Sequence, residues 1–199
     1  MASRTIVWVK EVDTGLESAD IHLQPHRLTA VGIALAAAPV AYRLDYKLET
    51  LGKFITSGLL VTTRGDGWSR KLDLRRTRTG RWNIRTSSKG DVDLPPPGGD
   101  VSQFSDALDC DLALSPLTNS MPVLRQGLLE GGGPHDFLMA WVSVPDLAVH
   151  PSRQRYTFVR KSGDLTVVRY ESQARDFVAE VTFDAEGLVV SYPGIGRRV

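Results

Sequence analysis

Apolar and polar residues alternate along most of this chain, as they do in β-strands that bury one face. The clearest run covers residues 40–50. Its apolar positions are Tyr42, Leu44, Tyr46 and Leu48, and the charged positions between them are Arg43, Asp45, Lys47 and Glu49. The same period predicts further strands at residues 5–10, 16–23, 28–38, 54–63, 68–75, 81–84, 137–144, 156–160, 165–170, 177–183 and 188–192.

Glycine-bearing turns separate many of these runs, at residues 65–67, 79–80, 162–164 and 184–187. A short turn with glycine between two alternating runs is a strong indication of a β-hairpin. Ten or more strands in one chain predict a mainly β protein with a large curved antiparallel sheet or an unclosed β-barrel.

The middle of the chain, residues 95–136, breaks this alternation. Three prolines and two glycines at residues 95–99 exclude a central strand and predict an exposed connection. One helical turn is expected at residues 103–108. The segment 109–125 then contains a helix start, with Ser115 as N-cap and Pro116 at the first helical position, and Pro122 is expected to end or kink the helix.

These elements predict a single domain over residues 1–199. Two strand-rich halves, about 1–94 and 137–199, are joined by the irregular and helical middle 95–136. We expect the sheet to wrap around the short central helix, so that the space between helix and sheet is a natural place for a hydrophobic ligand.

Composition narrows the class of protein. A chain of 199 residues that is 42% hydrophobic can bury one sizeable core, and a net charge of +1 gives no general attraction to nucleic acid. A single cysteine, Cys110, excludes an internal disulfide. The first residues lack the apolar run of a secretory signal, and no window approaches the roughly 18 apolar residues of a membrane helix. We expect a cytoplasmic protein without membrane insertion.

Charge is nevertheless uneven along the chain. Residues 70–89 contain eight basic residues and one acidic residue, and residues 91–111 contain six aspartates and no basic residue. The basic segment could bind an anionic headgroup, or the two segments could pair with each other. Trp82 lies in the basic segment and Trp68 just before it, and a nucleic-acid site would require such aromatic residues among the basic ones. The favoured interpretation is a solvated outer face of two strands, with no nucleic-acid partner.

Catalytic patterns are few. The four histidines are scattered without metal-ligand spacing, and no nucleophile elbow or phosphate loop occurs. Cys110 stands between Asp109 and Asp111, whose charges disfavour a thiolate. The two aspartates and His135 are the local candidates for acid–base chemistry, but the favoured interpretation is that the aspartates cap backbone amides and pair with Arg125. We therefore expect no enzymatic activity, metal or cofactor.

Several motifs together resemble a known family. They lie at residues 8, 15–17, 80–82, 91–94, 109–125, 141–147, 154–157, 169–172 and 192–199. In this order they resemble the bacterial family of putative glycolipid-binding proteins, formerly a domain of unknown function. The resemblance implies an unclosed barrel around a helix, similar to bacterial lipoprotein carriers. The glycines and prolines at 95–99 and 131–133 look like expansions of the family pattern. The carriers also act outside the cytoplasm, whereas this chain shows no export signal.

The resemblance implies non-enzymatic binding of an amphiphilic lipid, a glycolipid, between sheet and helix. Acyl chains are expected to lie on the concave sheet, with polar groups at the mouth. The residues expected to line the site are Trp8, Tyr42, Tyr46, Trp82, Leu117, Met121, Trp141, Tyr156 and Tyr170. Asn119 and Arg125 are candidate polar anchors, and Met121 is singled out for its adaptable thioether. Two alternatives stay open: an interaction or structural protein with a filled core, and an enzyme acting on a lipid or sugar. The oligomeric state is open.

Overall fold

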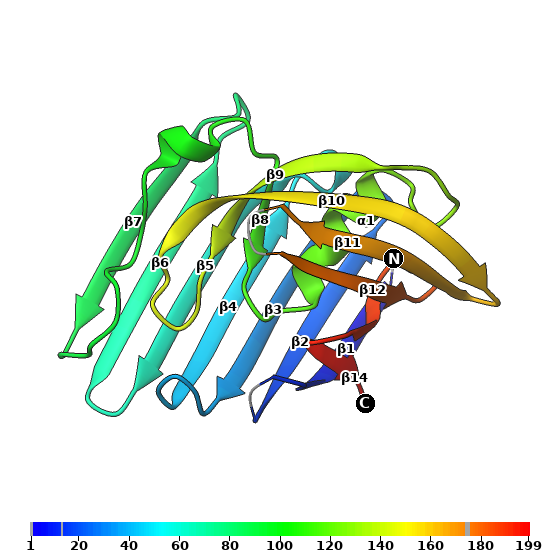
Figure 1. Cartoon of the computed structure of the whole chain (residues 1–199). Helices are drawn as coiled ribbons and strands as arrows, with labels where there is room; N and C mark the ends of the chain where they lie inside the picture. Colours follow the sequence, from blue (N-terminus) through cyan, green and yellow to red (C-terminus); the bar gives the residue numbers. More distant parts are fainter. Residues whose placement is uncertain (1, 13, 174–175) are drawn as a thin grey trace.

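The computed structural model describes residues 2–12, 14–173 and 176–199, and in it the strands form one sheet (Figure 1). The strands are β1 (Ala2–Lys10), β2 (Gly15–Gln24), β3 (Arg27–Ala36), β4 (Tyr42–Thr50), β5 (Thr56–Gly65), β6 (Trp68–Arg76), β7 (Trp82–Lys89), β8 (Asp109–Leu112), β9 (His135–Val142), β10 (Val149–Ser162), β11 (Leu165–Ser172), β12 (Phe177–Phe183), β13 (Val189–Tyr192) and β14 (Gly196–Arg198). The helical elements are α1 (Ser120–Arg125) and the 3-10 turns η1 (Gly52–Phe54), η2 (Val101–Phe104) and η3 (Leu117–Asn119).

The sheet has 14 strands in the order β7-β6-β5-β4-β3-β2-β1-β14-β13-β12-β11-β10-β9-β8. The two terminal strands pair at its centre, where Trp8 of β1 lies opposite Arg198 of β14. The end strands β7 and β8 do not pair with each other, so the sheet is not closed. The predicted fold, a large curved and unclosed sheet, is confirmed.

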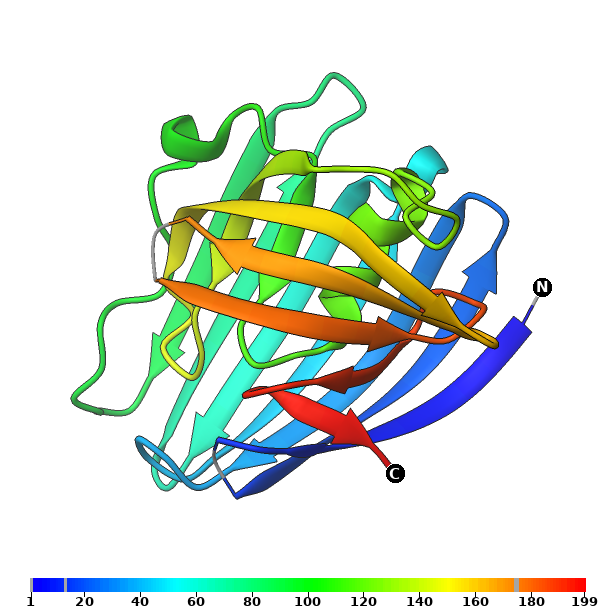
Figure 2. The same ribbon diagram turned by 45° about the vertical axis from the view of Figure 1, so that its right-hand side comes forward.

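The sheet folds over a central segment, residues 113–134, which contains η3 and α1. Strands β1–β7 form one broad layer, β9–β12 arch across it, and α1 lies between the two layers (Figures 1 and 2). The central segment joins the cores of both layers. Leu117 and Met121 pack with the core of the broad layer, whereas Val123 and Leu128 pack with the core under β10–β13. The predicted wrapping around a short helix is therefore what the structure contains.

Residues 109–112 differ from the sequence-based expectation. They form β8, which pairs with β9 in parallel, Asp109 lying opposite Met139. A parallel pair needs a long crossover connection, and here residues 113–134 with η3 and α1 supply it. The predicted segment 109–125 therefore begins with a strand, its helical part lies at residues 117–125, and the sheet is mixed at this one edge.

The start and end of the helix were also predicted wrongly. Ser115 does not cap it, because its hydroxyl donates to the Glu17 carboxylate at 2.6 Å. Pro122 does not end it either. It is the third residue of α1, where the backbone needs no N–H donor, and the helix continues to Arg125.

The 90–108 connection covers the gap between the end strands. Gly98 forms a parallel bridge with Ala148, and the Thr56 N–H donates to the Leu108 carbonyl at 3.1 Å. The side chains of Arg76 and Trp82 both donate to the Ala107 carbonyl, each at 3.0 Å. A short helical turn is present, but at η2, two residues earlier than predicted at its start. Asp100 accepts a hydrogen bond from the Ser102 N–H there and sets the earlier start.

Arg70 on β6 makes several of the hydrogen bonds that hold the 90–108 connection in place. Its buried guanidinium donates to the carbonyls of Leu94, Pro95 and Asp146. Two arginines of the basic segment therefore do contact the acidic segment, but through backbone carbonyls rather than carboxylates. No described helix has the length and apolar content needed to cross a membrane.

We expect Arg70→Met to lower the free energy of unfolding by about 2–4 kcal/mol, because it leaves three carbonyls without their charged donor. Arg85→Met, at an exposed position of the neighbouring strand β7, is the matched control and should cost well under 1 kcal/mol. Urea unfolding of both variants checks this, and equal losses would contradict the role given to Arg70.

Candidate functional site

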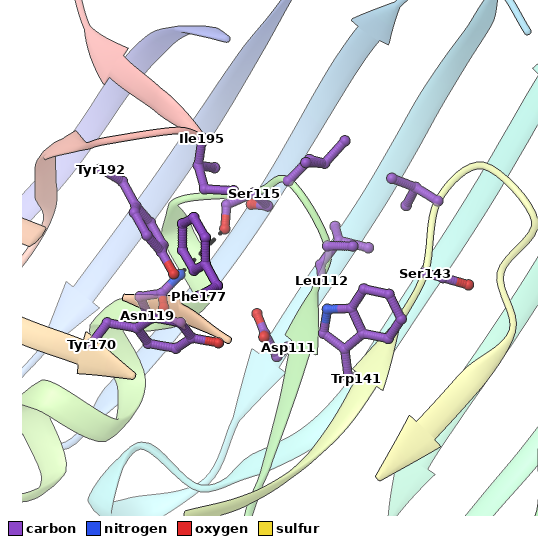
Figure 3. A pocket seen from close by; sticks show the side chains of 13 residues that line it. Asp111, Leu112, Ser115, Asn119, Trp141, Ser143, Tyr170, Phe177, Tyr192 and Ile195 are labelled. Carbon is purple, nitrogen blue, oxygen red and sulfur yellow. Dashed lines mark hydrogen bonds between the residues drawn. The ribbon is translucent and has the colours of Figure 1, made fainter. Parts of the chain in front are cut away.

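A pocket of about 450 Å³ lies beside the central helix, between β8, η3 and the ends of β9, β11, β12 and β13. Figure 3 shows Asp111 between Trp141 on one side and Tyr170 and Asn119 on the other. The lining residues are Asp111, Leu112, Ala113, Leu114, Ser115, Asn119, Trp141, Ser143, Val144, Tyr170, Phe177, Tyr192 and Ile195.

Burial divides this lining into two zones. The pocket floor consists of the nearly inaccessible residues, with 2–5% of their surface exposed: Leu112, Ser115, Asn119, Tyr170 and Tyr192. The pocket rim consists of the half-buried residues: Asp111, Ala113, Leu114, Trp141, Ser143, Val144, Phe177 and Ile195. Four of the five floor residues carry a polar side-chain atom, whereas six of the eight rim residues are apolar or tryptophan.

Aromatic rings make one wall of the pocket. The centroids of Tyr170 and Tyr192 are 5.7 Å apart, and those of Tyr170 and Phe177 are 6.0 Å apart. Tyr170 also packs edge-on against Tyr156, at 5.3 Å. These contacts fix the ring orientations, so the wall is preformed.

A hydrogen-bond network fixes the polar groups. Thr118 Oγ1 donates to Asp111 Oδ1 at 2.8 Å, and Gln154 Nε2 donates to Asp111 Oδ2 at 2.6 Å. The Tyr156 hydroxyl lies 2.8 Å from Asn119 Oδ1 and 3.0 Å from Gln154 Oε1. Since each partner is itself held, Asp111 and Asn119 present their polar atoms in set orientations.

Asp109 lies behind the pocket, in a buried ion pair. Both oxygens of Asp109 accept from Arg125, whose side chain is 6% exposed. Burial raises the pKa of Asp109, while Arg125 acts to lower it. The predicted pairing of an aspartate with Arg125 is confirmed. Arg125 also stacks on Phe137, 5.4 Å from the ring centre.

Cys110 is not arranged as a nucleophile. Its thiol is buried, and desolvation raises its pKa to about 12. Thr56 Oγ1 is 3.6 Å from the sulfur of Cys110 and 3.8 Å from that of Met121. Both sulfur atoms therefore lie in the packed core.

A second buried charge pair anchors the pocket wall, and sequence reasoning missed it. Lys10 Nζ is 3.7 Å from Glu17 Oε2 and also donates to the Leu114 carbonyl. Ser115 Oγ donates to Glu17 Oε1 at 2.6 Å, and the Tyr46 hydroxyl donates to the same oxygen at 2.8 Å. Leu114, held at a positive φ of 61°, and Ser115 are both lining residues.

The sequence does contain a signal for this pair. Glu17 shares the inward phase of Ala19 and Ile21, as Lys10 shares that of Ile6 and Trp8. A charged residue in an apolar phase indicates a buried partner. Burial raises the pKa of Glu17, while Lys10, Ser115 and Tyr46 act to lower it.

Metal binding has no support in the geometry, since the described residues contain no group of three or more histidine, cysteine, aspartate or glutamate side chains that could hold an ion.

The chain matches a known family over most of its length. A family model described as "Putative glycolipid-binding" matches residues 5–198. The chain belongs to this family. It is also similar to the crystal structure of a DUF1089 family protein from Pseudomonas aeruginosa. The two are 24% identical, with a TM-score of 0.70, over 93% of this chain and 92% of the other. None of the curated proteins matches the chain.

Three of the residues expected to contact a ligand line the pocket of this family member: Asn119, Trp141 and Tyr170. Arg125 is instead occupied by Asp109. The others are packed in the two cores, with at most 5% exposure and no part in the lining: Trp8, Tyr42, Tyr46, Trp82, Leu117, Met121 and Tyr156. Sequence reasoning did not consider Phe177, Tyr192 and Ile195 for the site, although they complete its wall.

The buried Glu17 gives a pH-dependent prediction. Its raised folded pKa means that the folded protein holds this proton more tightly than the unfolded chain, whose value is near 4.5. The stabilisation is present below 4.5 and is lost as pH rises through the interval between the two pKa values. Glu17→Gln cannot titrate. The stability of the wild type relative to this variant should therefore fall across that interval, as measured by urea unfolding at several pH values.

Glu180→Gln, at an exposed position of β12, controls for the loss of one surface carboxylate. A stability difference for Glu17→Gln that does not change with pH, or rises, would contradict the raised pKa.

Proposed function

We propose that the protein binds an amphiphilic glycolipid in this pocket without transforming it chemically. The observation that carries the proposal is the pocket itself. It combines an aromatic wall, a largely apolar rim and a small set of fixed polar groups, the composition typical of small-molecule sites. The family description supports the same ligand class.

The pocket fits an amphiphile on physical grounds. Apolar surface buried against the rim contributes about 25 cal/mol per Å². Trp141 and the tyrosines have apolar rings with polar tips, which suits the border between a chain and a hydroxylated headgroup. The carboxylate of Asp111 and the amide of Asn119 supply the directional hydrogen bonds that select a headgroup.

The binding site differs in place from the one expected on the concave sheet. The aromatic residues there are packed in the core, with Trp8 and Leu117 fully inaccessible. In this proposal the lipid binds beside the central helix, between β8 and the ends of β9, β11, β12 and β13, rather than along the concave face. The filled core is also what an interaction protein would have, so ligand binding is the property that separates the two functions.

The pocket can be tested by filling it. Ala113→Phe adds a ring at the rim and should weaken binding of octyl glucoside more than tenfold, because the ring occupies the ligand's volume. Ala185→Phe, on an exposed turn, makes the same change away from the pocket and should leave affinity unchanged. Titration below the micellar concentration, followed by tryptophan fluorescence, measures both.

Equal affinities for the two variants would contradict binding in this pocket, and no binding by the wild type would favour the interaction protein. Protein purified from its own host should release a glycolipid on extraction. Conversion of that glycolipid by the wild type, lost in Asp111→Asn at saturating ligand, would establish the enzymatic alternative.

A further inference from the structure

We propose that the glycolipid binds with its sugar inward, on the pocket floor, and that its chain leaves across the rim. This orientation rests on the proposed function and adds the part of the ligand that the site recognises. The opposite orientation, chain inward and sugar at the mouth, is the one expected when the interior of a curved sheet is an open apolar cavity.

The floor is chemically suited to a hydroxylated group. The least accessible part of the pocket carries hydroxyl and amide groups. They belong to residues that are each at most 5% exposed: Ser115, Asn119, Tyr170 and Tyr192. Hydroxyls and amides both donate and accept hydrogen bonds, as a sugar hydroxyl requires. Ser115 Oγ, whose proton goes to Glu17, and Asn119 Oδ1, which accepts from Tyr156, each have a further lone pair that a sugar hydroxyl can bond and an alkyl chain cannot.

The floor is also rigid. Asn119 Nδ2 donates to the Pro116 carbonyl at 3.2 Å, while its oxygen faces the Tyr156 hydroxyl. Ser115 is fixed by Glu17, which is itself paired with Lys10. Such preorganisation favours recognition of a group with a defined pattern of hydroxyls over a flexible chain.

The rim has the complementary chemistry. Half-buried apolar side chains and Trp141 surround the entrance of the pocket. The apolar side chains are those of Leu114, Val144, Phe177 and Ile195. The first methylenes of a chain leaving the floor would contact these side chains. Methylenes beyond them have no matching apolar cavity, because Leu112 under the pocket and Leu117 and Met121 on the helix are packed in the core.

The two orientations predict different dependences on chain length. With the chain inward, each added methylene is buried and raises affinity about fourfold, until the cavity is full. With the sugar inward, methyl glucoside already binds, affinity rises over the few methylenes that cross the rim, and it then stays constant. Wild-type protein titrated with methyl, butyl, octyl and dodecyl glucosides distinguishes the two by calorimetry.

Two variants show which part of the pocket binds the sugar and which part binds the chain. Asp111 is the charged residue of the rim and is bonded to Thr118, next to Asn119 of the floor. Asp111→Asn should weaken methyl and dodecyl glucoside by the same factor, about tenfold, because both sugars lose the same charged acceptor. Ile195→Ala, on the rim, should weaken dodecyl glucoside severalfold and leave methyl glucoside unchanged.

The outcomes separate this inference from the function on which it rests. A constant fourfold gain per methylene from butyl to dodecyl, with no binding of methyl glucoside, overturns the sugar-inward orientation while lipid binding stands. Equal affinity for dodecyl glucoside and for a dodecyl chain with a head lacking hydroxyls also overturns it. No binding of any glucoside overturns both.

Discussion

An unclosed sheet that folds over itself must cover two free edges and fill the space between its layers, and this requirement organises the whole molecule. Backbone groups at a bare edge cost free energy when buried and invite pairing with other chains when exposed. Here the 90–108 connection lies across the gap between β7 and β8, held by Arg70, Arg76 and Trp82 through its carbonyls. The long irregular middle of the sequence, including its run of prolines, is the covering that this topology needs.

The space between the layers is filled by the central segment, and two buried charge pairs determine how it sits. Glu17 and Lys10 fix Leu114 and Ser115, and Asp109 holds Arg125 at the end of α1. A buried ion pair is weak support for stability, since desolvation offsets most of the attraction. What such pairs do supply is a defined position, because either charge left alone would be far more costly. The segment that lines the pocket is therefore held in register with both layers.

The alternation of apolar and polar residues was sufficient to predict the sheet but not the residues of the site, and the physical reasons differ. Alternation in β4 and β12 follows directly from burial of one face, so the strands were predictable. Pro122 misled because its effect depends on its position within the helix, which the sequence alone does not give. Tyr46 and Tyr170 look alike as sequence, both aromatic and in inward phase. Tyr46 packs across Gly32 and reaches Glu17, whereas Tyr170 lines the pocket. Contacts between strands distant in the sequence decide whether such a tyrosine is packed in the core or lines the site.

The position of the pocket follows from how the helix fills the interior. Leu117, Met121 and Val123 fill the interior along the helix, so the helix leaves no room on the concave face. The chain leaves β8 at Leu112 and turns at Leu114, whose φ is positive, before the helical segment begins at Leu117. The loop after β9, with Ser143 and Val144, and the turn after β13, with Ile195, border the space that is left there. The pocket floor combines two residues from the start of the helical segment, Ser115 and Asn119, with three strand residues, Leu112, Tyr170 and Tyr192. Its rim consists mainly of apolar residues at or beside the ends of β8, β9, β12 and β13. The polarity of the floor thus has two sources, the Ser115 and Asn119 side chains at the start of the helical segment and the hydroxyls of the strand residues Tyr170 and Tyr192.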